Sequence, residues 1–233
     1  MASQQPANTI DCRPGHGREQ VATSIPVVSH LAQRLLKEGF ISDGHSSIGK
    51  TEALVWAVEH NHVPLVDELI AYGADVNIPA ADGWTCLGIA AQPPTPEILD
   101  ILLRAGAEVT AICSVGGYTA LHWAAGVGRS QAVKTLISHG SKVDARTSTL
   151  GFCPLHQAAD KGHVETIQAL LEAGANVECA DDEGWTPLYT ACRSGHPNAV
   201  QLLIDLGASI SSITREGWTP LHVAAIKAKH EIV

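Results

Sequence analysis

The chain has 233 residues, of which 45% are hydrophobic, 17% are charged and only 4% are aromatic, so it is neither disordered nor fibrous. With so few rings, a core built around large aromatic side chains is disfavoured, and the apolar mass must come from Ala, Val, Ile and Leu. The formal net charge is −9 and no run of Lys or Arg occurs. Direct binding to nucleic acid or to an anionic membrane is therefore disfavoured, because both need a concentrated basic surface.

The N-terminal segment, residues 1–24, is polar and lacks the apolar core of a signal peptide. We predict that it is a disordered tail. The six cysteines of the chain are scattered and form no C-x-x-C pair, which indicates reduced thiols in a reducing compartment. Since no stretch of 18 apolar residues occurs either, we expect an intracellular protein, in the cytoplasm, the nucleus or both.

Residues 44–51, Gly-His-Ser-Ser-Ile-Gly-Lys-Thr, match the G-x-x-x-x-G-K-T pattern of a phosphate-binding loop. That chemistry needs a buried strand before the loop and a parallel sheet around it, whereas only Phe40-Ile41 precede this segment. Gly49 also stands 34 residues before Gly83, the glycine of a repeated motif. We therefore interpret Gly49 as the turn of a first repeat and not as part of a nucleotide site.

A repeat of 33 or 34 residues organises the rest of the chain. Its marker is a Gly-aromatic-(Thr or Cys)-X-Leu motif, whose five copies begin at Gly83, Gly117, Gly151, Gly184 and Gly217. A second glycine keeps the same spacing, at Gly73, Gly106, Gly140, Gly174 and Gly207. Two independent markers with one period indicate an array of similar supersecondary units.

Each unit reads as two short helices. In the best copy Thr186 can cap the first helix and Pro187 can occupy its first turn, where a missing N–H costs nothing. A Gly-His pair marks the turn into the second helix, which Gly207 ends in a left-handed conformation. In the second copy residues 92–96, Gln-Pro-Pro-Thr-Pro, replace the Gly-His pair, so we predict that its first helix ends early.

The pattern T-P-L-H-x-A-A, followed by G-H, L-L and G-A, resembles the ankyrin repeat over roughly residues 50–233. The resemblance implies an all-α solenoid of about six helix-turn-helix units with β-hairpin-like loops. We predict an array over 50–233 whose last repeat is incomplete, preceded by a degenerate N-terminal capping half-repeat at 25–49. Because repeat arrays need polar terminal caps and this chain ends on apolar residues, we expect it to be a fragment of a longer array or a truncated gene product.

No catalytic constellation emerges from the sequence. Six of the twelve histidines occupy slots that the ankyrin resemblance assigns to hydrogen bonds between adjacent turns: His62, His122, His156, His163, His196 and His222. The others show no metal-ligand spacing, and no serine or cysteine stands in a nucleophile motif. The acidic run Asp181-Asp182-Glu183 is interpreted as a solvated turn. We predict no enzymatic activity, no cofactor and no metal.

The residue after the motif glycine is aromatic in all five copies, at Trp84, Tyr118, Phe152, Trp185 and Trp218. We call these five residues the aromatic column. The ankyrin resemblance places this slot at the hairpin turn beside the concave groove, where partner contacts are made. Two interpretations stay open and can both hold: the rings stiffen the stack, or they form a recognition stripe, since Trp and Tyr are favoured in binding hot spots.

The slots at the end of the first helices vary from copy to copy while the Leu and Ala slots hardly change, which separates free surface positions from scaffold. We predict partner contacts from the aromatic column and from His60, Asp160, Lys161, Arg193 and Lys227. Trp56 and Trp123, one residue before an Ala slot, are expected to be partly buried packing residues.

We therefore predict a monomeric protein–protein interaction scaffold that binds a partner protein or peptide on the concave face, without contacting nucleic acid or membrane. The alternative is a regulatory or recognition segment of a larger enzyme or nucleotide-driven signalling protein whose catalytic domain is absent from this chain.

Overall fold

The structure, a computed structural model, describes residues 46–80, 82–92, 96–112 and 116–226. These residues belong to the second of two compact units, Gly44–Val233. The predicted tail at 1–24, most of the predicted cap at 25–49 and residues 227–233, with Lys227, lie outside them.

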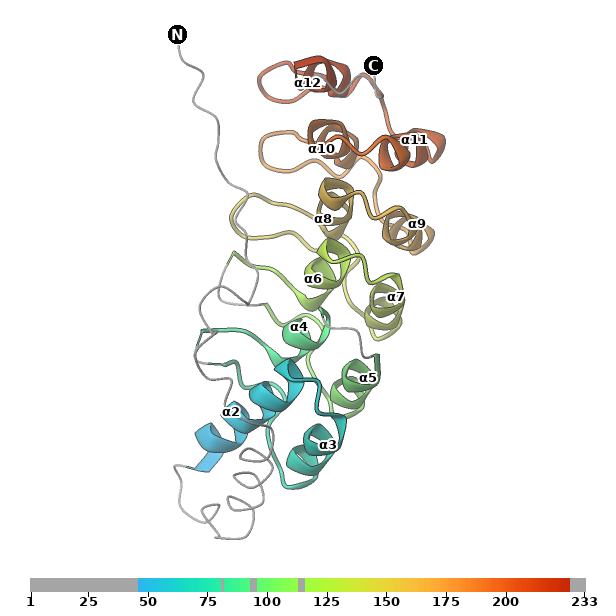
Figure 1. Cartoon of the computed structure of the whole chain (residues 1–233). Coiled ribbons are helices and arrows are strands. Elements are labelled where there is room, and N and C mark those ends of the chain that lie inside the picture. Colours follow the sequence, from blue (N-terminus) through green and yellow to red (C-terminus); the bar gives the residue numbers. More distant parts are fainter. Residues whose placement is uncertain (1–45, 81, 93–95, 113–115, 227–233) are drawn as a thin grey trace. The chain divides into compact units, whose positions relative to one another are not determined.

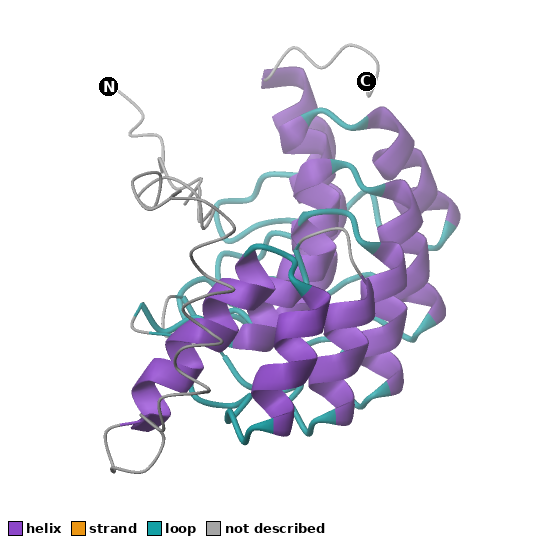
Figure 2. Ribbon diagram, turned by 60° about the horizontal axis from the view of Figure 1, so that its bottom comes forward, coloured by secondary structure: helices purple, strands orange, loops and turns teal. Residues whose placement is uncertain are grey.

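Helices in the described part of the chain alternate between two columns (Figures 1 and 2). The first helices are α2 (Ser46–Glu59), α4 (Cys86–Ala90), α6 (Ala120–Gly126), α8 (Pro154–Lys161), α10 (Pro187–Ser194) and α12 (Pro220–Ile226). The second helices are α3 (Val63–Ala71), α5 (Pro96–Arg104), α7 (Ser130–Ser138), α9 (Val164–Glu172) and α11 (Pro197–Asp205). Neighbouring helices of one column pack on each other, and the two helices of a repeat pack together from α2–α3 to α10–α11. The predicted all-α repeat is confirmed.

The helix boundaries follow from the capping residues that the sequence indicates. The Thr186 hydroxyl accepts a hydrogen bond from the Tyr189 N–H at 3.2 Å, and Pro187 follows in the first turn of α10. Gly195 ends α10 with φ +81°, and Gly207 follows α11 with φ +97°. A β-carbon is disfavoured in this left-handed conformation, so glycine fits both positions.

The core lies between the two columns and uses a repeated leucine slot of the first helices and another of the second helices. The motif leucines Leu87, Leu121, Leu155 and Leu188 are buried, as are the second-helix leucines Leu69, Leu102, Leu136, Leu170 and Leu203. Small alanines beside them, such as Ala124 and Ala158, let neighbouring helices approach closely. Burial of this repeated Leu/Ala pattern, at about 25 cal/mol per Å² of apolar area, supplies most of the stabilisation.

The second repeat departs as predicted, because α4 ends at Ala90 after five residues. The turn predicted at Gly49, however, is wrong, because Gly49 lies inside α2, which begins at Ser46. In the later copies the equivalent glycine is left-handed, as at Gly83 (φ +82°) and Gly184 (φ +80°), and the first helix begins after it. The helix of the first repeat instead continues upstream through Gly49.

Lys50 and Thr51 are therefore helical residues in the part of the chain that the structure describes. The Lys50 ammonium group donates a hydrogen bond to the Tyr72 carbonyl at 3.2 Å. A phosphate-binding loop would need residues 46–49 in an irregular conformation with free backbone N–H groups. The helical backbone of these residues is not that geometry.

Candidate functional site

The rings of the aromatic column lie against their own first helices. Four of the five rings contact the side chain four positions later, with ring centroids 5.3–5.7 Å apart; the pairs are Tyr118–His122, Phe152–His156, Trp185–Tyr189 and Trp218–His222. This spacing places both members of a pair at the N-terminus of one helix. The contacts order the rings before any partner arrives.

Trp84 differs from the other members of the column because its ring is buried, with 8% of the residue exposed. It packs on Trp123 of the next repeat with a centroid distance of 4.4 Å, and Tyr118 packs on the same indole at 5.1 Å. The three rings tie two repeats together. The contacts of Trp84 therefore fit the interpretation that the ring stiffens the stack of repeats, and little of its surface is accessible to a partner.

The middle and C-terminal rings are more accessible. Phe152 and Trp185 are half-buried, and Trp218 is 39% exposed. Trp56 and Trp123 are half-buried packing residues, as predicted. Exposure at one repeat position thus differs from copy to copy, and Trp218 is the most exposed ring of the column.

A charged cluster joins the ends of α8 and α10. Asp160 contacts the ammonium of Lys161 at 3.1 Å and the guanidinium of Arg193 at 3.4 Å. The Ser194 hydroxyl donates to the same carboxylate at 2.7 Å. We call these four residues the Asp160 cluster. Burial alone would raise the pKa of Asp160, but the Ser194 hydrogen bond and the two cations outweigh it and lower the pKa.

Arg193 connects this cluster to the aromatic column. Its guanidinium carbon lies 4.6 Å from the centre of the Trp185 ring while one nitrogen contacts Asp160. A guanidinium can stack on an indole and pair with a carboxylate at the same time. The structure therefore brings four predicted site residues together: Trp185, Arg193, Asp160 and Lys161. Ser194, in the slot beside Arg193, was not singled out by the sequence analysis and completes the group.

The remaining predicted contacts lie elsewhere. His60 stacks on Trp56 with a centroid distance of 3.9 Å, and its Nδ1 donates to the Trp56 carbonyl at 2.9 Å. It therefore covers the end of α2 and is not part of the Asp160 cluster. Lys227 lies outside the described residues.

Four slot histidines tie repeats together, as the ankyrin resemblance implied. The Nε2 atoms of His122 and His156 donate to the carbonyls of Phe152 and Trp185, at 3.0 and 2.8 Å. His163 and His196 reach back to Gly126 and Asp160 in the same way. Burial lowers the pKa of His122 and of His156 to about 4, so both rings are neutral near pH 7. The other two make local contacts: His62 caps α3, and His222 contacts Thr219.

The solvated-turn interpretation is wrong for Asp181 and right for its two neighbours. Asp181 is buried, and its carboxylate accepts hydrogen bonds from the N–H groups of Trp185 at 2.7 Å and Glu183 at 2.9 Å. Burial raises its pKa. The repeat offers the signal that was missed, because the same slot holds Thr147 and Thr214. Their hydroxyls accept hydrogen bonds from the backbone N–H groups of Phe152 and Trp218.

Comparison with known proteins agrees with this architecture. The family model for ankyrin repeats, in three copies, matches residues 26–113, 94–181 and 155–233. The chain belongs to the ankyrin-repeat family. Ankyrin repeats generally mediate protein–protein interactions.

The ankyrin-repeat chain is also similar to a mitochondrial disaggregase of Bos taurus, with 40% identity over 63 residues. That segment is 27% of this chain and 9% of the disaggregase, so the likeness is confined to a small part of a longer protein. Among the described residues, none of the helices combines the length and apolarity that a membrane crossing requires.

Proposed function

We propose that this array binds a partner protein or peptide through the surface formed by Trp185, Trp218 and the Asp160 cluster. Tyr118 and Phe152 occupy the equivalent position in the preceding repeats and extend this surface along the array. His60 and Lys227 stay predicted contacts at other points of the array. The proposal assigns recognition to this chain and assigns it no catalytic step.

The contact between Arg193 and the Trp185 ring is the observation that carries the proposal. Trp and Arg are the residues most enriched in binding hot spots, and here they are ordered against each other and against Asp160. An ordered pair loses less conformational entropy on binding than two free side chains would lose. This surface is therefore better prepared for a partner than isolated exposed residues would be.

The charges indicate the class of partner. The cluster offers one carboxylate beside two cations, next to apolar rings, on a chain whose net charge is −9. A protein surface or peptide carrying an apolar group and charges of both signs fits this mixture, and a polyanion does not. We place the interaction in the cytoplasm or nucleus and expect the array to act as a monomer.

The alternative function, a regulatory segment of a larger enzyme or signalling protein, is favoured by one observation. The disaggregase match covers a small part of a protein much longer than the matched segment. Reading the full coding sequence of the gene distinguishes the two. A catalytic domain in the same reading frame would support the alternative, and an uninterrupted series of further repeats would contradict it.

A pull-down with matched variants tests the proposed surface. Wild-type array, Arg193→Ala and Trp218→Ala are each used to capture partners from cell extract, with Lys134→Ala on the exposed side of α7 as the control. Captured proteins are quantified by mass spectrometry, and affinity for the strongest one is then measured with purified components. We expect both surface variants to weaken binding about tenfold or more while the control binds normally. Equal binding by all four chains, with unchanged stability, would overturn the proposal.

A further inference from the structure

At two repeat positions one copy has a residue type that differs from the other copies, and the structure places these two residues side by side. Cys153 stands in the cap slot that holds threonine in four other copies, Thr85, Thr119, Thr186 and Thr219. Cys179 stands in the loop slot that holds a different residue in the others, such as Ala111, Ala145 and Ser212. The two cysteines are 26 residues apart, and stacking brings them to the same buried position.

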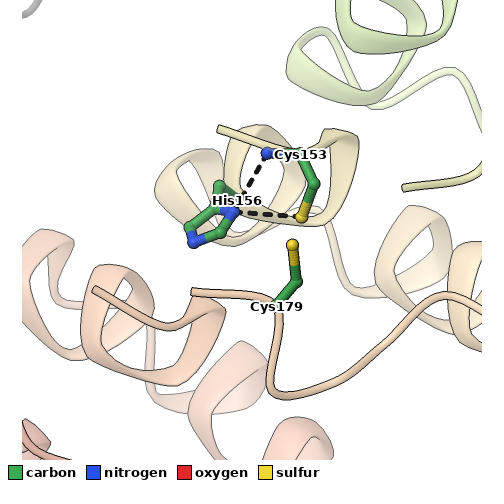
Figure 3. Close-up of side chains that lie close together, drawn as sticks. All are labelled: Cys153, His156 and Cys179. Atoms are coloured by element: carbon green, nitrogen blue, oxygen red, sulfur yellow. Dashed lines mark hydrogen bonds between the residues drawn. The ribbon is translucent and has the colours of Figure 1, made fainter. Parts of the chain in front are cut away.

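Together with His156 they form a converging set of donor atoms (Figure 3). The sulfur atoms of Cys153 and Cys179 and a ring nitrogen of His156 all lie within 4.8 Å of one another. All three residues are buried. In Figure 3 the two sulfurs point toward each other, one from the start of α8 and the other from the loop after α9.

The imidazole of His156 is held in the tautomer whose Nδ1 carries the lone pair that a cation would need. Its Nε2 donates to the Trp185 carbonyl at 2.8 Å, so the lone pair is on Nδ1. Nδ1 accepts a hydrogen bond from the Cys153 N–H at 3.2 Å and lies 3.0 Å from the Cys153 sulfur, so a cation would take this lone pair from the N–H. Histidines that bind metals commonly donate their second nitrogen to a backbone carbonyl in this way.

Arg146 supports negative charge on the sulfurs. Its Nη1 lies 3.9 Å from the Cys179 sulfur and donates to the Ala180 carbonyl at 2.7 Å. A cation beside a cysteine favours the thiolate, which is the form that binds metals.

We propose that Cys153 Sγ, His156 Nδ1 and Cys179 Sγ bind one thiophilic d10 cation, Zn²⁺ or Cu⁺. The ion would replace the thiol protons of Cys153 and Cys179, and both protons would leave to solvent. Zinc–sulfur bonds are about 2.3 Å long and zinc–nitrogen bonds about 2.0–2.1 Å. Donors on one ion therefore lie at most about 4.6 Å apart, close to the observed convergence. The ion would tie the start of α8 to the loop after α9.

The coordination number separates the two cations. Zn²⁺ prefers four ligands, and in the described part of the chain no fourth His, Cys, Asp or Glu joins this group, so it would need an added ligand. Cu⁺ is satisfied by fewer, soft ligands. With two thiolates it leaves one net negative charge, which Arg146 faces. Both ions share the thiolate–imidazole chemistry, and the experiment distinguishes them.

The test compares the reduced full chain with Cys153→Thr/Cys179→Ala, which installs the Thr119 and Ala145 pair of the preceding repeat. Cys192→Ala, which removes a buried thiol outside the group, is the control. Each chain is titrated with Zn²⁺ and, separately, with Cu⁺ in competition with a chromophoric chelator. Co²⁺ serves as a spectroscopic probe of thiolate ligation. Circular dichroism checks that every variant folds.

We expect wild type and control to bind about one equivalent, with a thiolate-to-cobalt absorption band and a raised Tm. The double variant should lose at least ~100-fold in affinity, together with the band. Tighter binding of one ion identifies the cation. Absence of the cobalt band in folded wild type would overturn the zinc form of the proposal. Equal binding by the double variant, or a reduced wild type that binds neither ion, would overturn the proposal altogether. Should the double variant fail to fold, Cys179→Ala alone gives the same comparison.

Discussion

The same motif occurs in the interior of the array and in its last described repeat, with opposite burial. Residues 117–122, Gly-Tyr-Thr-Ala-Leu-His, and residues 217–222, Gly-Trp-Thr-Pro-Leu-His, differ at only two positions. Leu121 is fully buried, whereas Leu221 is 55% exposed. His122 is 1% exposed and bonds to the next repeat, whereas His222 is exposed and bonds within its own turn.

The difference shows that a motif residue becomes core only when the following repeat covers it. Phe152 supplies the carbonyl that binds His122, and α8 packs on α6. No described residue covers His222 in this way. Stability in such an array is a sum of repeat and interface contributions, so the same side chain can carry different weights in two copies. Substitutions at equivalent slots test this comparison.

The largest effect is expected for Trp84→Ala, compared with Trp218→Ala. Trp84 is buried against Trp123, so its removal should lower the free energy of unfolding by about 3–5 kcal/mol. Trp218 is partly exposed, and its loss should cost less than about 1 kcal/mol. Urea denaturation of both variants measures the difference. Equal losses would show that burial in this slot does not set its contribution.

The motif leucines give the second test. Leu121→Ala should cost about 2–5 kcal/mol because it leaves a cavity between α6 and its neighbours. Leu221→Ala should cost less than about 1 kcal/mol, since its side chain already meets solvent. Thermal unfolding followed by circular dichroism is the measurement. A large loss at Leu221 would mean that further residues cover it in solution.

The pH dependence of stability provides the third test, through His122. Its pKa falls from 6.5 to about 4 on folding because burial disfavours the charged ring. The unfolded chain therefore binds the proton more tightly, so stability is lost as the pH falls from about 6.5 to about 4 and changes no further below that. At 1.36 kcal/mol per pKa unit the loss is roughly 3 kcal/mol.

Denaturation at several pH values in this window compares wild type with His122→Gln. The variant should lose part of the pH dependence. A pH dependence that survives intact in His122→Gln would contradict the assignment to this ring.

The smallest effect on stability is expected for Arg193→Ala. Ion pairs that meet solvent contribute little, and the Arg193 side chain is 30% exposed, so the cost should stay below about 1 kcal/mol. The same variant should weaken partner binding far more than it weakens folding. A stability loss as large as that of Trp84→Ala would assign Arg193 to the scaffold and remove it from the proposed surface.

Much of the fold could be predicted because the signals are local. The spacing of the motif glycines set the repeat, and Thr186 and Pro187 marked the start of α10. The early end of α4 followed from a proline-rich segment. The prediction failed at the first repeat, where the glycine spacing indicated a turn but α2 extends through Gly49 to Ser46.

The candidate site was less predictable because its members meet across repeats. The sequence separated variable slots from scaffold slots and so named Asp160, Lys161 and Arg193. It could not show that Arg193 lies over Trp185 and pairs with Asp160, 33 residues away. The burial of Asp181 was also missed, because its hydrogen bonds depend on how the turn folds back on itself.

By itself the sequence determined the period, the helix caps and the left-handed glycines, since these depend on backbone chemistry within a few residues. Only the tertiary structure decided which copy of a slot is buried, as Trp84 and Trp218 show. It also decided that Cys153, His156 and Cys179 converge. Those properties depend on the neighbouring repeat, whose packing places side chains about one repeat length apart in the chain beside each other.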